Sequence, residues 1–109
     1  MASPQVENGY TMISNELLEA IIRAKMNGTQ FAIVLAVIRA TYGFHKKSRT
    51  LGLAFFTVAT GRNKRQIGIE INKLIKRKIL IVKTESTFGR SRELKLNKDY
   101  DSWSNDEGV

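Results

Sequence analysis

The sequence predicts a small α+β domain that is mainly helical and ends in a β-hairpin. Apolar residues recur at intervals of three and four through much of residues 14–77, which is the spacing of one helix face. The pattern then changes to a largely β-branched apolar run at Ile79–Val82 and to strict alternation at Arg92–Leu96. Turn-forming residues separate these two runs, so we expect the strands to pair as a hairpin.

Residues 1–12 are expected to form an extended arm, because they hold the only proline and a turn-like run at Glu7–Tyr10. A helix should follow, capped by Ser14 or Asn15. Its apolar face is expected to comprise Leu17, Leu18, Ile21 and Ile22.

A second helix should begin at a capping-box pattern, in which Gln30 follows Asn27 by three positions. It is apolar on every side over Phe31–Ile38, so we expect it to be the central, buried helix. Gly43 is the expected left-handed residue at its end.

The next segment predicts a very short strand at Thr50–Leu51 and a short helix over Leu53–Thr60 that stops at Gly61. A longer helix, capped by Asn63, should run to about Arg77.

With the hairpin added, the order of elements is that of a winged helix-turn-helix, whose last helix is followed by a two-stranded wing. We assign this domain to residues 13–98. The arm over residues 1–12 precedes it, and residues 99–109 are expected to form an acidic, flexible tail.

Positive charge is concentrated in one half of the chain. The formal net charge is +8, and residues 46–98 hold fifteen of the eighteen Lys and Arg residues but three of the ten acids. Residues 99–109 hold four acids and no base. This imbalance favours a polyanionic partner, most commonly a nucleic acid, over a generally basic surface.

The helix over Asn63–Arg77 carries much of this charge on one side. At about 100° per residue, Ile67, Ile71 and Leu74 fall on one narrow stripe that can pack in a core. A solvated face would usually mix Glu with Lys, whereas Glu70 is the only acid here and lies beside the aliphatic stripe. We therefore predict a recognition helix for the major groove of double-stranded DNA. The side opposite the stripe holds Arg65, Ile69, Asn72, Lys73 and Lys76.

The start of this helix supports the same interpretation. Lys and Arg oppose the positive end of a helix dipole, at a cost of about 0.3 kcal/mol or more each, unless an anion binds there. In helix-turn-helix docking, the N-terminal residues of the second helix enter the major groove. The candidates here are Arg62, Asn63, Lys64, Arg65 and Gln66.

Several of these side chains have a second interpretation. Gln66 can cap its own helix or contact adenine, and Asn72 can be an ordinary surface residue. Ile69 can touch a thymine methyl group or a partner subunit. Arg90 and Arg92, on the wing, can reach a phosphate or the minor groove, or can simply add solubility.

Neither an enzyme nor a cofactor or metal site is predicted. His45 is the only histidine and cysteine is absent, so a histidine or thiolate site lacks its partners. The ten acids form no plausible catalytic pair in a folded cleft, four of them lie in the tail, and no phosphate-binding glycine run occurs. The N-terminus has no signal-peptide pattern, and the longest apolar run, Phe31–Ile38, is far below the roughly 18 residues of a membrane span. A cytoplasmic protein without a membrane partner is expected.

Three stretches of the chain resemble the N-terminal domain of the phage replication protein O family. They are Glu7–Ala20, Leu35–Lys47 and Ala59–Ile67, and the resemblance covers roughly residues 7–83. The first two stretches are fairly specific to the family, whereas the third would match many winged helices.

The resemblance implies a winged-helix domain that binds repeated sites in a phage replication origin as a homodimer. In that family a separate C-terminal region recruits the replicative helicase through a loader protein. Contact with the host replication machinery is therefore expected through a region that these residues do not contain.

The chain departs from the family pattern at three positions. Gly52 and Ala54 stand where Ser is usual, so the short helix lacks its usual cap. Glu70 stands where a small core residue is usual, and we expect it at the rim of the core, paired with Lys73 or Lys76. Two other functions fit the same fold and charge: a winged-helix transcriptional regulator, and a winged helix that binds an acidic protein.

Overall fold

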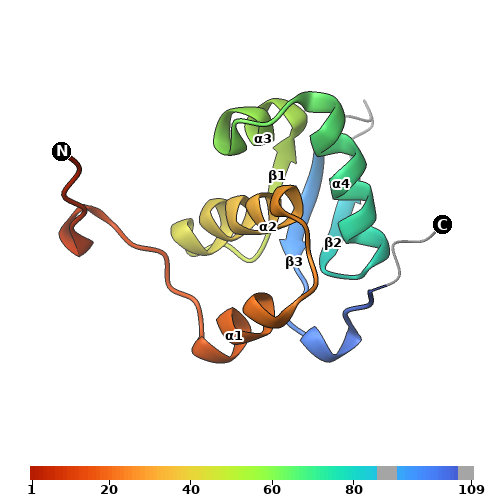
Figure 1. Cartoon of the computed structure of the whole chain (residues 1–109), viewed down its shortest axis with the longest axis horizontal. Helices are drawn as coiled ribbons and strands as arrows, with labels where there is room; N and C mark the ends of the chain where they lie inside the picture. Colours follow the sequence, from red (N-terminus) through yellow and green to blue (C-terminus); the bar gives the residue numbers. More distant parts are fainter. Residues whose placement is uncertain (86–90, 106–109) are drawn as a thin grey trace.

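The computed structural model describes residues 1–85 and 91–105. Over these residues the chain is α+β, with four α-helices and a three-stranded antiparallel sheet (Figure 1). The helices are α1 (Asn15–Arg23), α2 (Gly28–Thr41), α3 (Leu53–Thr60) and α4 (Lys64–Lys76); the strands are β1 (Arg49–Gly52), β2 (Leu80–Glu85) and β3 (Ser91–Leu96). This architecture and order are compatible with a winged helix.

Side-chain caps start three of the helices where the sequence predicts them. Ser14 accepts a hydrogen bond from the backbone N–H of Leu17 at the start of α1. Asn27 and Gln30 form the full capping box of α2. The Asn63 side chain accepts from the N–H of Gln66 at the start of α4, at 2.8 Å. These bonds satisfy N–H groups that have no partner inside the helix.

The ends of the helices are only partly as predicted. Gly61 ends α3 in the left-handed region, with φ 71°, as expected. The prediction for Gly43 is wrong: the chain continues through a 3-10 turn, Tyr42–Phe44, and His45 adopts the left-handed conformation with φ 57°. A Cβ on Gly43 would lie 2.7 Å from Nη1 of Arg39, so the end of that flexible side chain would have to move.

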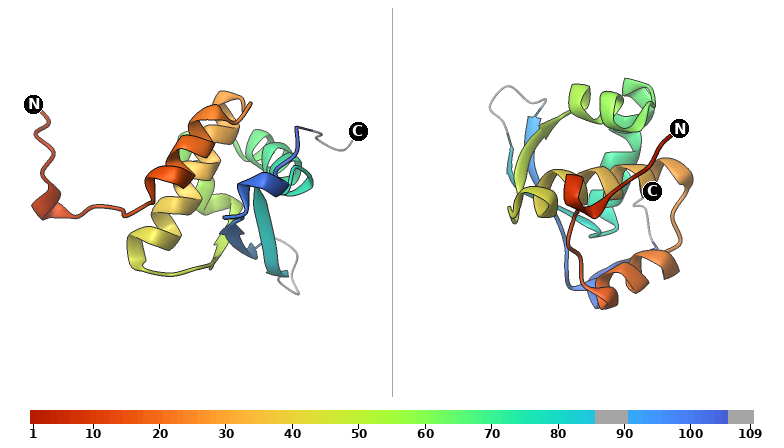
Figure 2. Two further views of the ribbon diagram at one scale, coloured as in Figure 1. Left: turned by 90° about the horizontal axis from the view of Figure 1, so that it is seen from below. Right: turned by 90° about the vertical axis from the view of Figure 1, so that its left-hand side faces the viewer.

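The strands form one sheet in the order β1–β3–β2 (Figure 2). The predicted hairpin is present as β2 paired with β3, and the very short predicted strand is β1, which pairs with the other edge of β3. The register places Gly52 opposite Ser91 and Arg49 opposite Leu94. The end of β1 therefore lies beside the start of β3, immediately before α3.

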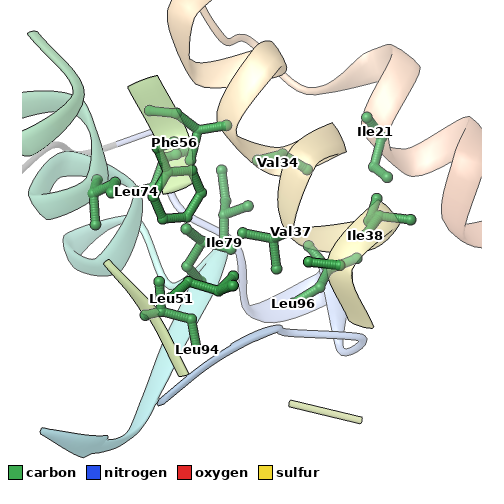
Figure 3. Close-up of a cluster of buried hydrophobic side chains, with 14 of the residues drawn as sticks. Ile21, Val34, Val37, Ile38, Leu51, Phe56, Leu74, Ile79, Leu94 and Leu96 are labelled. Atoms are coloured by element: carbon green, nitrogen blue, oxygen red, sulfur yellow. The ribbon is translucent and has the colours of Figure 1, made fainter. Parts of the chain in front are cut away.

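The core lies between the helices and the sheet (Figure 3). Phe56 from α3 and Leu74 from α4 are fully buried, together with Val37 of the central helix α2. Ile79 and Leu94 close this cluster from the sheet side. Helix α2 is thus the buried helix that the sequence predicts, although Leu35 on its outer side is half exposed.

Helix α1 buries only half of its predicted apolar face. Leu17 and Ile21 contribute to the core, whereas Leu18 and Ile22 remain exposed. Ahead of it, the arm extends away from the domain, with a single 3-10 turn at Val6–Asn8 (Figure 1).

A buried polar network joins α2 to α4. Glu70, at the core rim as predicted, accepts hydrogen bonds from Nε2 of Gln30 at 3.0 Å and Nδ2 of Asn27 at 3.2 Å. Its other oxygen lies 3.8 Å from Nζ of Lys73, which is one of the two partners expected from the sequence. Gln30 in turn accepts from Nη1 of Arg77, at 3.2 Å. Every charged group of the network thereby keeps a partner, as burial requires.

Arg77 also holds the chain after the sheet. It is almost fully buried and donates from Nε to the Ser104 carbonyl, at 2.7 Å, and from Nη2 to Asn105. Trp103 packs against the core, and the Tyr100 hydroxyl donates to Glu16 of α1. The segment predicted as a flexible tail therefore packs against the domain as far as Asn105, and the domain limits drawn from the sequence stay a prediction.

Replacing Gln30 tests the buried network. The Gln30→Leu variant leaves Arg77 and Glu70 each without one hydrogen-bond partner, so the free energy of unfolding should fall by about 1–3 kcal/mol. Urea unfolding followed by circular dichroism measures this change. Gln5→Leu, in the exposed arm, is the control. An equal, small effect of both variants would contradict the role of the network.

Acid should weaken the contact between Glu93, on the central strand β3, and Ser48. The pKa of this carboxyl lies below its ordinary value of 4.5, mainly because it accepts a hydrogen bond from the Ser48 hydroxyl, with Lys83 nearby. A lowered folded-state pKa stabilises the fold above that ordinary value, and the contribution disappears as pH falls through the folded-state pKa. Ser48→Ala should therefore lower the melting temperature at neutral pH and have little effect in strong acid. A pH-independent difference between the two proteins would reject this.

Candidate nucleic-acid interface

Helix α4 presents its basic side to solvent because its aliphatic side is buried in the core. Ile67, Ile71 and Leu74 are buried, at 0%, 5% and 0% exposure, which confirms the predicted aliphatic stripe. Rotation of the helix about its axis is thereby set, since successive side chains are about 100° apart. The side chains that consequently point outward and are exposed include Lys64, Arg65, Ile69, Asn72 and Lys76.

A groove runs between α4 and the sheet, which we call the α4–β3 groove. It encloses about 610 Å³ and is bounded by α4 on one side and by β1, β3 and the start of α3 on the other. Its apolar lining includes Leu51, Leu53 and Leu94. Basic and amide side chains from α4 and β3 line it too: Lys64, Arg65, Asn72 and Arg92.

A hydrogen bond across this groove joins two residues that the sequence suggested separately. Arg92 of β3 donates from Nη1 to Oδ1 of Asn72 on α4, at 3.0 Å. The hairpin arginine is thus held beside the helix, and its guanidinium is positioned near the basic side of α4. Arg90, the other hairpin candidate, lies outside the described residues.

Two of the predicted contact residues near the start of α4 bond to the rest of the domain. Arg62 is half buried and donates from Nε to the Thr29 hydroxyl, at 3.2 Å, and from Nη1 to the Thr60 carbonyl. Gln66 donates its side-chain amide to the same Thr29 hydroxyl, at 2.9 Å. Its side chain therefore does not cap its own helix; Asn63 does that. These bonds fasten the helix-turn-helix corner to the start of α2.

The remaining candidates occupy two different environments. Lys73 is half buried and close to Glu70, so part of its charge is already balanced. Lys76 is exposed, one turn further along α4. The structure thus brings Lys64, Arg65 and Asn72 to the groove and directs Lys73 toward the polar network.

Leu53 and Gly68 are among the groove residues that the sequence did not predict as contact residues. Leu53 opens α3 but also lines the groove, which depends on how β1 leads into that helix. Gly68 lies within α4 on the groove side. A glycine inside a strongly helical pattern is a local signal for a special packing or binding role, and this signal was available in the sequence.

Other kinds of site find no support in the described part of the chain. No group of three or more His, Cys, Asp or Glu residues is placed to hold a metal ion there. Among the same residues, no helix has the length and apolar character needed to cross a membrane.

The chain matches one protein family over most of its length. The family described as Bacteriophage replication protein O matches residues 3–103. DNA replication protein gp18 of Salmonella phage P22 is 32% identical over 99 residues, which are 91% of this chain and 34% of gp18. Replication protein 15 of Enterobacteria phage phi80 is 26% identical over 98 residues, 90% of this chain and 32% of that protein.

Replication protein O of Escherichia phage lambda is 44% identical over a shorter stretch of 41 residues, which are 38% of this chain and 12% of that protein. No solved structure matches the chain. The chain spans about a third of the length of the P22 and phi80 relatives. The family match includes the arm, all four helices, the sheet and the segment that Arg77 holds. The chain therefore belongs to the bacteriophage replication protein O family.

Proposed function

We propose that this chain is a winged-helix domain that binds double-stranded DNA at a phage replication origin, with α4 in the major groove. The observation that carries the proposal is the geometry of α4. Its aliphatic stripe is buried, its basic side is exposed, and Arg92 of the hairpin is bonded to Asn72 on that same side. Family membership supports the role in replication.

In this proposal the side chains divide by task. Arg65 and Asn72 reach base edges, and Ile69 supplies an apolar contact for a thymine methyl group. Lys64, Lys73, Lys76 and the hairpin arginines Arg90 and Arg92 contact phosphates. The start of α4 contacts the DNA backbone with its free N–H groups. It is held in place by the side-chain bonds of Arg62, Asn63 and Gln66, which lie beside the same phosphates.

The domain has no enzymatic activity in this proposal and acts in the host cytoplasm. It binds repeated origin sites as a homodimer, and the longer relatives reach the host replication machinery through their further length. The basic half of the chain, with its excess of Lys and Arg, supports an electrostatic attraction to duplex DNA.

Selection of bound fragments from phage and host genomes tests this function. We expect clustered repeats with constant spacing, because a dimer on repeated sites needs two half-sites in a constant relation. Isolated sites near promoters would favour a transcriptional regulator instead. Recovery no better than that of a random pool would favour binding of an acidic protein.

Arg65 and Lys64 should differ in what their loss does to binding. Arg65→Ala should reduce discrimination between the selected site and an unrelated duplex by about 1–3 kcal/mol per contacted base. Lys64→Ala should lower the affinity for both duplexes alike. It should also reduce the slope of log affinity against log salt concentration by about one, since one phosphate contact is lost. Wild-type affinity itself should fall on the order of a thousandfold between 50 and 200 mM salt if about six phosphates are neutralised.

Fluorescence anisotropy over a series of salt concentrations measures the affinity for each duplex, the discrimination between the two duplexes and the salt dependence of binding. Lys25→Ala, on the segment between α1 and α2, is a matched control for loss of one exposed positive charge. Equal losses on both duplexes for Arg65→Ala would remove Arg65 from the base-reading residues.

A further inference from the structure

Gly68 occupies an unfavourable position for a glycine. It lies inside α4, one helical turn after Lys64 and one before Asn72, and it lines the α4–β3 groove. Glycine in a helix interior loses more backbone freedom on folding than alanine does, so it weakens the helix. The stability of α4 would therefore benefit from almost any other small residue here.

The fold gives no reason for the missing side chain. A Cβ built on Gly68 would meet Cδ2 of Leu53 at 4.0 Å, which is an ordinary van der Waals contact. Its φ is not in the left-handed region, unlike that of Gly61. Gly43 shows the contrasting case, since a Cβ there would be 2.7 Å from Arg39. Alanine at position 68 would be accommodated without a clash inside the protein.

The groove in front of Gly68 has the chemistry of a site for a sugar–phosphate strand. Lys64 lies on one side of it and Arg92 on the other, where both side chains can pair with phosphate oxygens. Leu53, which is partly exposed, gives the groove an apolar surface suited to the carbon faces of deoxyribose. One strand of a duplex would fit between the helix and the hairpin, with its backbone passing over Gly68.

We infer that position 68 is kept free of a side chain so that the deoxyribose–phosphate backbone of one DNA strand can approach α4 closely. The inference rests on the proposed function and deepens it, because it assigns the part of the α4–β3 groove beside Gly68 to the backbone of one strand, while Arg65, Ile69 and Asn72 stay the candidates for base contacts. Glycine at position 68 makes α4 less stable than alanine would, but it lets the DNA backbone lie closer to the helix.

The Gly68→Ala variant tests this by moving stability and binding in opposite directions. The unfolding equilibrium constant should fall about fivefold, since alanine strengthens the helix. Affinity should fall about tenfold or more for the selected duplex and for an unrelated duplex alike, because an extra methyl group overfills a close contact that both duplexes make. Ile22→Ala, an exposed substitution on α1, is the matched control and should leave both affinities unchanged.

Thermal unfolding and fluorescence anisotropy with the two duplexes give the result. A stabilised variant that binds as tightly as wild type would overturn the inference. So would a destabilised variant, since the glycine would then serve internal packing, and a loss confined to the selected duplex would overturn the assignment to the backbone. If wild type binds neither duplex, the proposed function itself fails, and the inference with it.

Discussion

Burial of one aliphatic stripe on α4 orients everything else on that helix. Ile67, Ile71 and Leu74 enter the core beside Phe56 and α2, so the helix cannot rotate without exposing them to water. At roughly 25 cal/mol per Å² of apolar surface, exposing even one such side chain costs about 1.5–3 kcal/mol. The outward direction of Lys64, Arg65 and the side chains that follow is a consequence of this packing.

The polar network adds a second constraint, on position along the helix axis. Glu70 lies on the border of the aliphatic stripe and bonds directly to Gln30 and Asn27 at the start of α2. A shift of α4 by one residue would leave a buried carboxylate and the Gln30 amide without partners. Arg77 extends the same network to the segment ending at Asn105, so the last turn of α4 is tied to the chain that leaves the domain.

The candidate interface is formed by several elements, α4, β1, β3 and the start of α3, and not by one basic helix alone. The α4–β3 groove exists because β1 ends where α3 begins and because β3 lies between β1 and β2. The bond from Arg92 to Asn72 links hairpin and helix, so their side chains face a ligand together. Close positive charges repel one another, and the acids that relieve this, Glu70 and Glu93, lie away from the groove lining.

Local sequence patterns were sufficient to predict the helices and strands and to tell the buried side of α4 from its exposed side. Caps at Ser14, Asn27 and Asn63 and the turn at Gly61 depend on bonds or backbone angles within a few residues, so they can be recognised without knowing the fold. The buried stripe of α4 and the pairing of Glu70 with Lys73 follow from helical spacing for the same reason.

Only the tertiary structure decided which polar side chains bond to distant parts of the chain. Arg62 and Gln66 look like their neighbours in the sequence, and Gln66 stays exposed, yet both bond to Thr29, more than thirty residues away. Arg77 follows the basic pattern of the helix end but is buried by Gln30 and the segment near Ser104. The chain continues past Gly43 through the 3-10 turn Tyr42–Phe44, so the left-handed residue after α2 is His45. Periodicity specifies which face of a helix is apolar, whereas partners distant in sequence determine how each polar group at the edge of that face is used.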